Sequence, residues 1–427
     1  MLIVAIAFVA LLLIGMPVAF AIGIAGCLFF LQHPELPFTI PVQVTVSQTQ
    51  NFALLAIPLF IMAGNFMNRS GITERLLDLA SVLAGRLKGG LAQVSIALSA
   101  LMGGVSGSAI ADAAMQSRML GGAMVARGFT RGFAAGVLSF SSVLTPVIPP
   151  GIGMILYGSI GQVSIGRLFA AGFLPAFLLW LALSAAVWLT ARRRGYAPER
   201  ATRPSLGEVG GALRGGIWAL LFPVFLLLGL RMGVFTPSEI GAFAVIYGLV
   251  IGVAIYRKLT RKGFVEALES SLADVGAVMF LIALSAIVSY GIVFERVPET
   301  ISGWIVGLTG NLYGAMLVIA LFVIAAGFVI DATVLIIMLT PIFLPVVRDL
   351  GGDPVHFGIV FIIAATIGNF TPPVGAAMYA VCSILKCPVG AYARESLPLF
   401  LAVGLVTLLL IALPQAVLFV PNLIFGG

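Results

Sequence analysis

Two aspartates lie within apolar stretches of the sequence, at similar places in its two halves. Asp112 follows the segment GGVSGSAIA, and Asp331 follows GFVI, 219 residues later. A carboxylate at membrane depth is costly and is usually retained for function. Each aspartate could bind a cation, relay a proton, or cap the second helix of a hairpin. The sequence leaves these three roles open.

A double proline follows each aspartate. Ser139–Gly158 reads SFSSVLTPVIPPGIGMILYG, and Ala365–Cys382 reads ATIGNFTPPVGAAMYAVC. Proline removes a backbone donor and blocks continuation of a helix. In hydrocarbon the freed carbonyl groups need a replacement partner from protein, water or an ion. The sequence therefore predicts two broken membrane helices, with a transport site at the breaks.

Carbonyl and hydroxyl oxygens at such breaks are suitable ligands for Na⁺. The first predicted Na⁺ site consists of Gly103, Ser106, Ser108, Ser142, Thr145, Val147, Pro149 and Pro150. The second consists of Gly327, Ile330, Asp331, Thr333, Thr366, Asn369, Thr371 and Pro372. Because half-helix N-termini favour anions, we expect a carboxylate substrate between the two sites. Its predicted contacts are Ser106, Ser108, Asp112, Asn369 and Thr371. Alternatively, these small and hydroxyl-bearing residues only let helices pack closely.

The composition identifies the class of protein in which these motifs lie. Of the 427 residues, 61% are hydrophobic and 9% are charged, whereas soluble domains carry about 25% charged residues. The sequence therefore predicts an all-α polytopic membrane protein. The three cysteines have no metal-binding spacing, and an odd number in apolar segments argues against a disulfide framework. No phosphate-binding loop is present in the sequence, so direct use of ATP is not expected.

Hydropathy predicts the elements that position the motifs. In the first half we expect the span Leu2–Leu31, the loop Gln32–Gln50, the span Phe52–Met67, an amphipathic helix in Asn68–Lys88, a re-entrant hairpin Leu91–Leu120 with its tip at Gly103–Ser108, the broken helix Gly132–Gly161 and the span Leu168–Thr190. A basic linker, Arg192–Arg214, follows, and then the extra crossing Gly216–Leu230.

The same order of elements returns in the second half. It comprises the spans Val234–Tyr256 and Ser271–Phe294, an amphipathic helix in Glu295–Gly310, the hairpin Leu312–Val347, the broken helix Phe357–Leu385 and the span Leu397–Val420. We therefore predict a first repeat (1–191), a linker with an extra crossing (192–233) and a second repeat (234–427). An odd number of crossings separates the repeats, so the second is expected to be inverted.

The distribution of basic residues orients this scheme. If the linker is cytoplasmic, nineteen of the 23 lysines and arginines lie on that side. Only Arg167, Arg231, Arg296 and Arg348 lie on the other side. Cytoplasmic loops carry such an excess, and this also accounts for the net charge of +7. The scheme predicts a cytoplasmic N-terminus and an outer, periplasmic C-terminus.

Several of these segments resemble a known family. IPLFIMAGNFMNRSGITERLLDLASVLAG, SGSAIADAA, IPPGIGMILYG, GFVID and TPPVG are similar, in the same order, to the large membrane subunit (DctM-like permease) of tripartite ATP-independent periplasmic (TRAP) transporters. The sequence departs from the family pattern at the extra Thr-Pro of SSVLTPVIPPG and at Asn369. These departures affect which residues are predicted to bind Na⁺ and substrate more than they affect the predicted fold.

The resemblance implies Na⁺-driven secondary uptake of an organic acid, such as a C4-dicarboxylate or sialic acid, in the cytoplasmic membrane of a bacterium or archaeon. It implies a small four-helix membrane subunit and a periplasmic binding protein as partners. It further implies an elevator mechanism, in which hairpins and broken helices move against a scaffold. Two or more Na⁺ ions per cycle are expected, and no ATP.

Three other functions are alternatives to this transporter hypothesis. A stand-alone Na⁺-coupled dicarboxylate carrier would share the architecture and need no partners. An intramembrane aspartyl protease would need Asp112 and Asp331 close enough to share a proton, which hairpins entering from opposite sides disfavour. A channel is disfavoured by the paired breaks, which suit alternating access.

Overall fold

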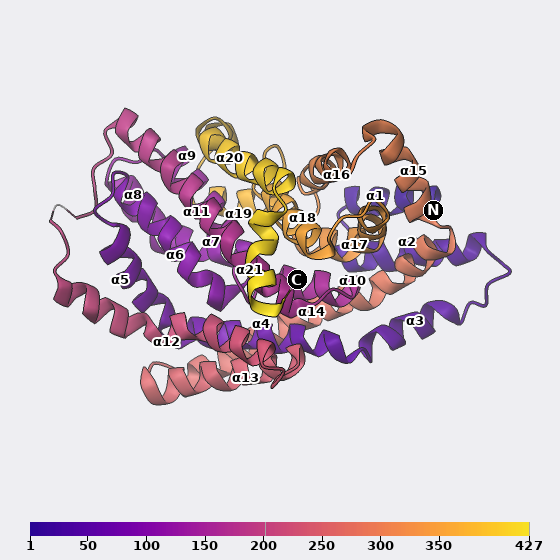
Figure 1. The fold of residues 1–427 in the computed structure, drawn as a ribbon, viewed down its shortest axis with the longest axis horizontal. Helices are drawn as coiled ribbons and strands as arrows, with labels where there is room; N and C mark the ends of the chain where they lie inside the picture. Colours follow the sequence, from indigo (N-terminus) through magenta and orange to yellow (C-terminus); the bar gives the residue numbers. More distant parts are fainter. Residues whose placement is uncertain (201, 427) are drawn as a thin grey trace.

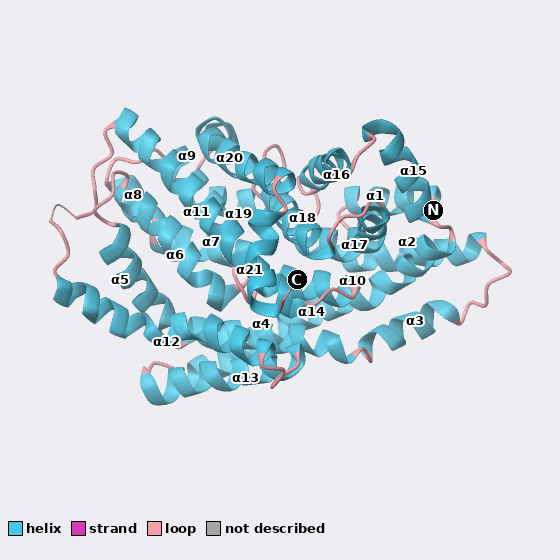
Figure 2. Ribbon diagram, in the orientation of Figure 1, coloured by secondary structure: helices cyan, strands magenta, loops and turns pink. Residues whose placement is uncertain are grey.

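The computed structural model describes residues 1–200 and 202–426, without the side chain of Ala53. Within this part of the chain every regular element is a helix (Figure 2). Six of these helices are long and apolar enough to cross a membrane, or seven if one bent pair counts as a span. The structure thus confirms an all-helical protein with many apolar helices.

The longest helix, α14 (Arg261–Phe294), organises one side of the molecule. Packed along it are α2 (Val18–Gln32), α3 (Ile40–Thr49) and α4 (Ala56–Arg69). Arg69 pairs with Glu266 at one end of α14, and His33 lies 3.3 Å from Glu295 just beyond the other end. Figure 1 shows α3 and α14 extending together toward the end of the molecule where the N-terminus lies. We call α2, α3, α4 and α14 the wall.

The first apolar segment is not a single crossing. It consists of α1 (Leu2–Leu13) and α2, separated by a turn that contains Gly15 and Pro17. The two helices pack against each other, and both the N-terminal ammonium and His33 bond to Glu295. The two ends of this segment therefore lie together. The prediction of one span over Leu2–Leu31 is wrong because Gly15 and Pro17 turn the chain back.

Three further boundaries differ from the sequence-based prediction. The expected loop Gln32–Gln50 contains α3, and η1 (Phe52–Leu55) leads from it into α4. The linker is shorter than expected, because Ser205 and Glu208 form a capping box that starts α12 (Leu206–Arg231). The last predicted span divides into α20 (Val389–Ala412) and α21 (Gln415–Phe425), with Pro414 between them.

The helices are interrupted where the sequence predicts hairpin tips and helix breaks, and we keep the names hairpin and broken helix for these pairs. The first hairpin is α6 (Gly90–Ser106) with α7 (Ala109–Met119), and the second is α16 (Leu312–Ala326) with α17 (Ala332–Asp349). The first broken helix comprises α9 (Arg131–Ser141), η2 (Ser142–Leu144) and α10 (Ile152–Gly161), and the second comprises α18 (Pro354–Asn369) and α19 (Ala376–Leu385). The remaining helices are α5 (Ile72–Ala84), α8 (Gly121–Ala126), α11 (Ile165–Arg194), α13 (Pro237–Val250), the π-helical η3 (Ile251–Ile255) and α15 (Val297–Thr309).

Each hairpin has its base beside the far end of the other half's broken helix. At the first base, Gly121 meets the side chain of Leu385 at the end of α19. At the second base, the Arg348 guanidinium donates to the carbonyl of Gly161, at the end of α10, over 3.0 Å. The two hairpins therefore enter from opposite ends of the broken helices, and their tips meet between those ends.

Candidate functional site

The two hairpin tips enclose a small cavity of about 60 Å³. It is lined by both tips, by the first turns of α7, α10 and α17, by Pro146 in the first break and by the C-terminal half of α18 up to Asn369. The polar lining groups are Ser108, Asp331, Thr333, Thr366 and Asn369. Gly107, with φ of +62°, brings the first tip onto the break, because a Cβ there would lie 2.7 Å from the Pro150 carbonyl oxygen. No basic residue lines this cavity.

Asp331 forms the polar end of the second tip. One carboxylate oxygen accepts from the backbone N–H of Thr333 over 2.8 Å and so caps α17. The other accepts from the side-chain amide of Asn369 over 3.0 Å. Asn369 is buried, and among the described residues its amide oxygen has no hydrogen-bond partner. A buried free acceptor beside a carboxylate suits a cation or a donor group of a ligand.

Asp112 is fully buried but does not line this cavity. Its carboxylate accepts from the hydroxyls of Ser99 and Thr145, each over 2.8 Å, and from the Gln116 amide over 3.0 Å. These bonds tie both arms of the first hairpin to the break. The cap of α7 is Ser108, which accepts from the N–H of Ala111. The structure therefore places Asp112 in an internal network and gives the capping role to Ser108.

Most of the other predicted ligands take part in helix packing or bond to backbone carbonyls, and do not line the cavity between the tips. Close packing at glycines brings each tip against a break. Gly103 lies beside the side chain of Ile148, and Gly327 lies against the backbone of Gly368. The carbonyl oxygen of Pro149 lies near Gly104. The hydroxyls of Ser142, Thr366 and Thr371 bond back to carbonyls of their own helices. Outside the lining of the cavity are Gly103, Ser106, Asp112, Ser142, Thr145, Val147, Pro149, Pro150, Gly327, Ile330, Thr371 and Pro372. The carbonyl of Val147 packs on Gly172 of α11 instead.

A second cavity, of about 260 Å³, adjoins the first and shares Ser108, Ile152 and Thr333 with it. It also contains Ser106, and its wall side carries Asn65, Asn68 and Asp274. Asp274 accepts from the Asn65 amide over 3.1 Å. Asp274 is not among the site residues predicted from the sequence. The available signal was a single carboxylate within the apolar run of α14, which is expected to face water or a partner.

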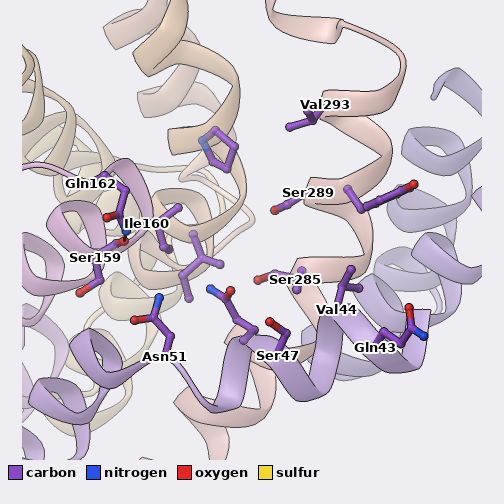
Figure 3. Close-up of a pocket in the computed structure, with 15 residues that line it drawn as sticks. Gln43, Val44, Ser47, Asn51, Ser159, Ile160, Gln162, Ser285, Ser289 and Val293 are labelled. Atoms are coloured by element: carbon purple, nitrogen blue, oxygen red, sulfur yellow. Dashed lines mark hydrogen bonds between the residues drawn. The ribbon is translucent and has the colours of Figure 1, made fainter. Parts of the chain in front are cut away.

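A third and larger cavity, of about 640 Å³, lies farther along the wall (Figure 3). It is bordered by α3 and α14 on one side and by α10 and α17 on the other, and it shares no lining residue with the tip cavity. Along α14, the buried Leu281 and Ile282 separate the residues that line the second cavity from those that line the third. The tip cavity therefore adjoins the Asp274 cavity and not the large one.

The N-terminal ammonium, His33, Glu35 and Glu295 form a titratable group just beyond the end of α14, which we call the Glu295 cluster. The hydrogen bond that His33 donates to Glu35, and then the one to Glu295, raise the pKa of His33. The N-terminal ammonium and His33 lower the pKa of Glu295. These ion pairs hold the ends of α1 and α2 against the end of α14.

Residues 5–416 match the family model described as "Tripartite ATP-independent periplasmic transporter, DctM component". The isethionate TRAP transporter permease DctMQ of Oleidesulfovibrio alaskensis is 33% identical over 96% of the chain, which spans 65% of that relative's length. The sialic acid TRAP transporter large permease SiaM of Vibrio cholerae is 32% identical over 98% of both chains.

Among solved structures, the YdaH transporter of Alcanivorax borkumensis is similar to the chain with a TM-score of 0.64. The identity is 15%, and the match covers 87% of each chain. At this identity the likeness concerns the fold alone.

Proposed function

We propose, from the premise that the chain belongs to the family of the DctM component of tripartite ATP-independent periplasmic transporters, that it carries a small organic acid across a membrane. Members of this family are transporter permeases and not enzymes. Two relatives of nearly equal identity are named for isethionate and for sialic acid. Overall identity therefore does not distinguish among organic acids.

The observation that carries the proposal is the cavity between the hairpin tips. Asp331 and the free amide oxygen of Asn369 meet there, and no basic side chain lines the space. A carboxylate substrate needs compensating positive charge, which helix N-termini and co-bound cations can supply. We propose Na⁺ as that cation, with two or more ions per cycle and without ATP.

The movement proposed is of the elevator type. The hairpins and broken helices would move as one body along the wall and carry the tip cavity from one side to the other. Support comes from the two larger cavities, which lie at different levels of α14 on either side of Leu281 and Ile282. The two inverted repeats predicted above would provide the opposed hairpins that this movement needs.

The proposed partners are a small four-helix membrane subunit and a periplasmic binding protein, in the cytoplasmic membrane of a bacterium or archaeon. We place the linker after α11 in the cytoplasm, together with the ends of α4 and α14 that are joined by Arg69 and Glu266. The opposite end of α14, with the Glu295 cluster, then lies on the outer side. Since the N-terminus lies in that cluster, we now propose an outer N-terminus instead of the cytoplasmic one. The C-terminal segment stays outside, where Asn422 accepts from Arg167.

Uptake of labelled organic acids into proteoliposomes tests this function. The vesicles contain the chain and its small subunit, with an inward Na⁺ gradient, with and without the binding protein. Uptake that needs both Na⁺ and the binding protein is the expected result. Uptake with Na⁺ alone would identify a stand-alone carrier, and uptake driven only by protons would contradict the Na⁺ coupling.

A further inference from the structure

The cavity of about 640 Å³ is lined by hydroxyl and amide groups among apolar side chains, and no charged residue of the described chain lines it. On α3, Gln43 and Ser47 lie four residues apart and so share one face of the helix, and Asn51 follows just beyond the helix end. On α14, Ser285 and Ser289 repeat at the same interval. In Figure 3 the hydroxyls of both serines point from α14 toward the space between the helices.

Several side chains that line this cavity keep free hydrogen-bonding groups, although the Ser285 hydroxyl donates to the carbonyl of Ile282. Among the described residues, the side chains of Gln43, Ser47, Gln48 and Ser289 have no hydrogen-bond partner. Across the cavity, Ser159 is 4% exposed, and its hydroxyl oxygen is buried without a partner. Polar faces within a membrane protein line water or a polar ligand, because lipid cannot satisfy them. The lining is therefore suited to groups that both donate and accept hydrogen bonds.

The size of the cavity fits a small molecule. About 640 Å³ falls within the range of about 300–1,000 Å³ of small-molecule sites. A bare dicarboxylate brings two negative charges and no donors, and the lining offers it no cation. A chain of hydroxyl groups, in contrast, can exchange hydrogen bonds with amides and hydroxyls on both α3 and α14.

We propose that this cavity is a transit site that binds the hydroxyl groups of the substrate, and that the transported acid is a polyhydroxylated monocarboxylate of the sugar-acid class. The inference rests on the proposed transport function and narrows its substrate. In the elevator movement, the hairpins and broken helices shift along α14. The acid passes from this cavity to the tip cavity when that shift carries the hairpin tips past Leu281 and Ile282. Selection by hydroxyl groups thus precedes the ion-coupled step.

Uptake kinetics in the complete transporter provide the first test, with labelled D-gluconate, N-acetylneuraminate and succinate. We expect a lower KM for at least one polyhydroxylated acid than for succinate. The double variant Ser289→Ala with Gln48→Leu removes two hydrogen-bonding groups and should raise that KM about tenfold, with the maximal rate unchanged. Ser270→Ala is the matched control on the same helix, since Ser270 bonds to its own backbone outside the cavity.

Thiol labelling provides a second test that does not depend on transport. Ser289→Cys is prepared with Cys27, Cys382 and Cys387 replaced by alanine and is labelled with an impermeant maleimide in detergent. Millimolar D-gluconate or N-acetylneuraminate should slow labelling severalfold, whereas succinate should not. The same acids should leave labelling of a Ser270→Cys control unchanged.

Preference for succinate, or an unchanged KM in the double variant, would overturn the inference while leaving transport intact. Protection by the binding protein without any acid would also overturn it, because the cavity would then be a docking site for that protein. If no acid is transported with a Na⁺ gradient, the proposed function fails. Protection by a polyhydroxylated acid would then still support a binding site, and its absence would reject both proposals.

Discussion

The two hairpins differ in what their aspartates contact. In the first, Asp112 accepts three hydrogen bonds from side chains within the protein and has no contact with the tip cavity. In the second, Asp331 caps its helix and faces the cavity together with Asn369. One carboxylate braces a hairpin against a break, and the other is available to a ligand.

The caps show which positions correspond. Ser108 and Asp331 each cap the second helix of a hairpin, and they are 223 residues apart, as are Pro149 and Pro372. At this offset Asp112 corresponds to Leu335, one helical turn beyond the cap. Its partners Ser99, Gln116 and Thr145 correspond to Phe322, Leu339 and Gly368. If the two halves are repeats, as predicted, the residues of the first half's internal polar network are replaced by apolar residues and a glycine in the second half.

The strongest test of this difference is removal of the ligand-facing pair. We expect Asp331→Ala and Asn369→Ala each to abolish uptake while the protein still reaches the membrane, because both line the tip cavity. Na⁺-driven uptake and the amount of protein in the membrane are measured together. Asp349→Ala, at the exposed end of the same helix, is the control. Normal Na⁺-dependent uptake by either variant would remove that residue from the site.

Removal of the bracing aspartate should act on stability instead. Asp112→Ala leaves the hydroxyls of Ser99 and Thr145 without their acceptor and removes one of the two acceptors of the Gln116 amide, and we expect a loss of about 2–4 kcal/mol in the free energy of unfolding. Asp331→Ala should cost only about 1 kcal/mol, through the lost cap. Thermal or denaturant unfolding in detergent compares the two. Equal losses would show that the hairpins do not differ in this way.

Labelling from either side of the membrane tests whether the two hairpins are inverted. A cysteine at Ala123, near the base of the first hairpin, should react only from the cytoplasm, as should Arg193→Cys in the last turn of α11. Asp349→Cys, at the base of the second hairpin, should react only from outside. An impermeant thiol reagent on intact cells makes the measurement. Labelling of Arg193→Cys in intact cells would reverse the proposed orientation.

The smallest expected effect lies outside both hairpins, in the Glu295 cluster. The pKa of His33 is raised, so its stabilising contribution is complete below its ordinary pKa of 6.5 and is lost as the pH rises through the raised value. His33→Gln should therefore lower the unfolding temperature slightly near pH 6 and leave it unchanged near pH 9. A decrease of equal size at both pH values would assign the effect to packing against Phe29 and Phe294.

Sequence patterns predicted the breaks and tips because local chemistry determines them. The double prolines at 149–150 and 372–373 disfavour a continuous helix more than a single proline does, since the single prolines Pro175 and Pro223 lie inside α11 and α12. Glycine at 107 permits the left-handed turn of the tip. The length of the apolar segment predicted one span over Leu2–Leu31, although Gly15 and Pro17 allow the chain to turn within it. The prediction paired Asp112 with Asp331 because both follow tip glycines. Asp331 is itself the helix cap, whereas Asp112 lies one helical turn after the cap Ser108, and this difference determines what each side chain contacts. Asp274 and the polar lining of the large cavity depend on how distant helices pack, which residue spacing alone does not show.

The length of α14 couples the wall to the surrounding lipid. Its apolar part, residues 271–294, spans about 36 Å, which exceeds the hydrocarbon thickness of about 30 Å and calls for a tilt of roughly 30°. A thicker bilayer would bring α14 closer to the membrane normal, and α2, α3 and α4 would turn with it because they pack along its length. The spacing between the wall and the hairpin tips would then change, so acyl-chain length becomes a determinant of transport rate.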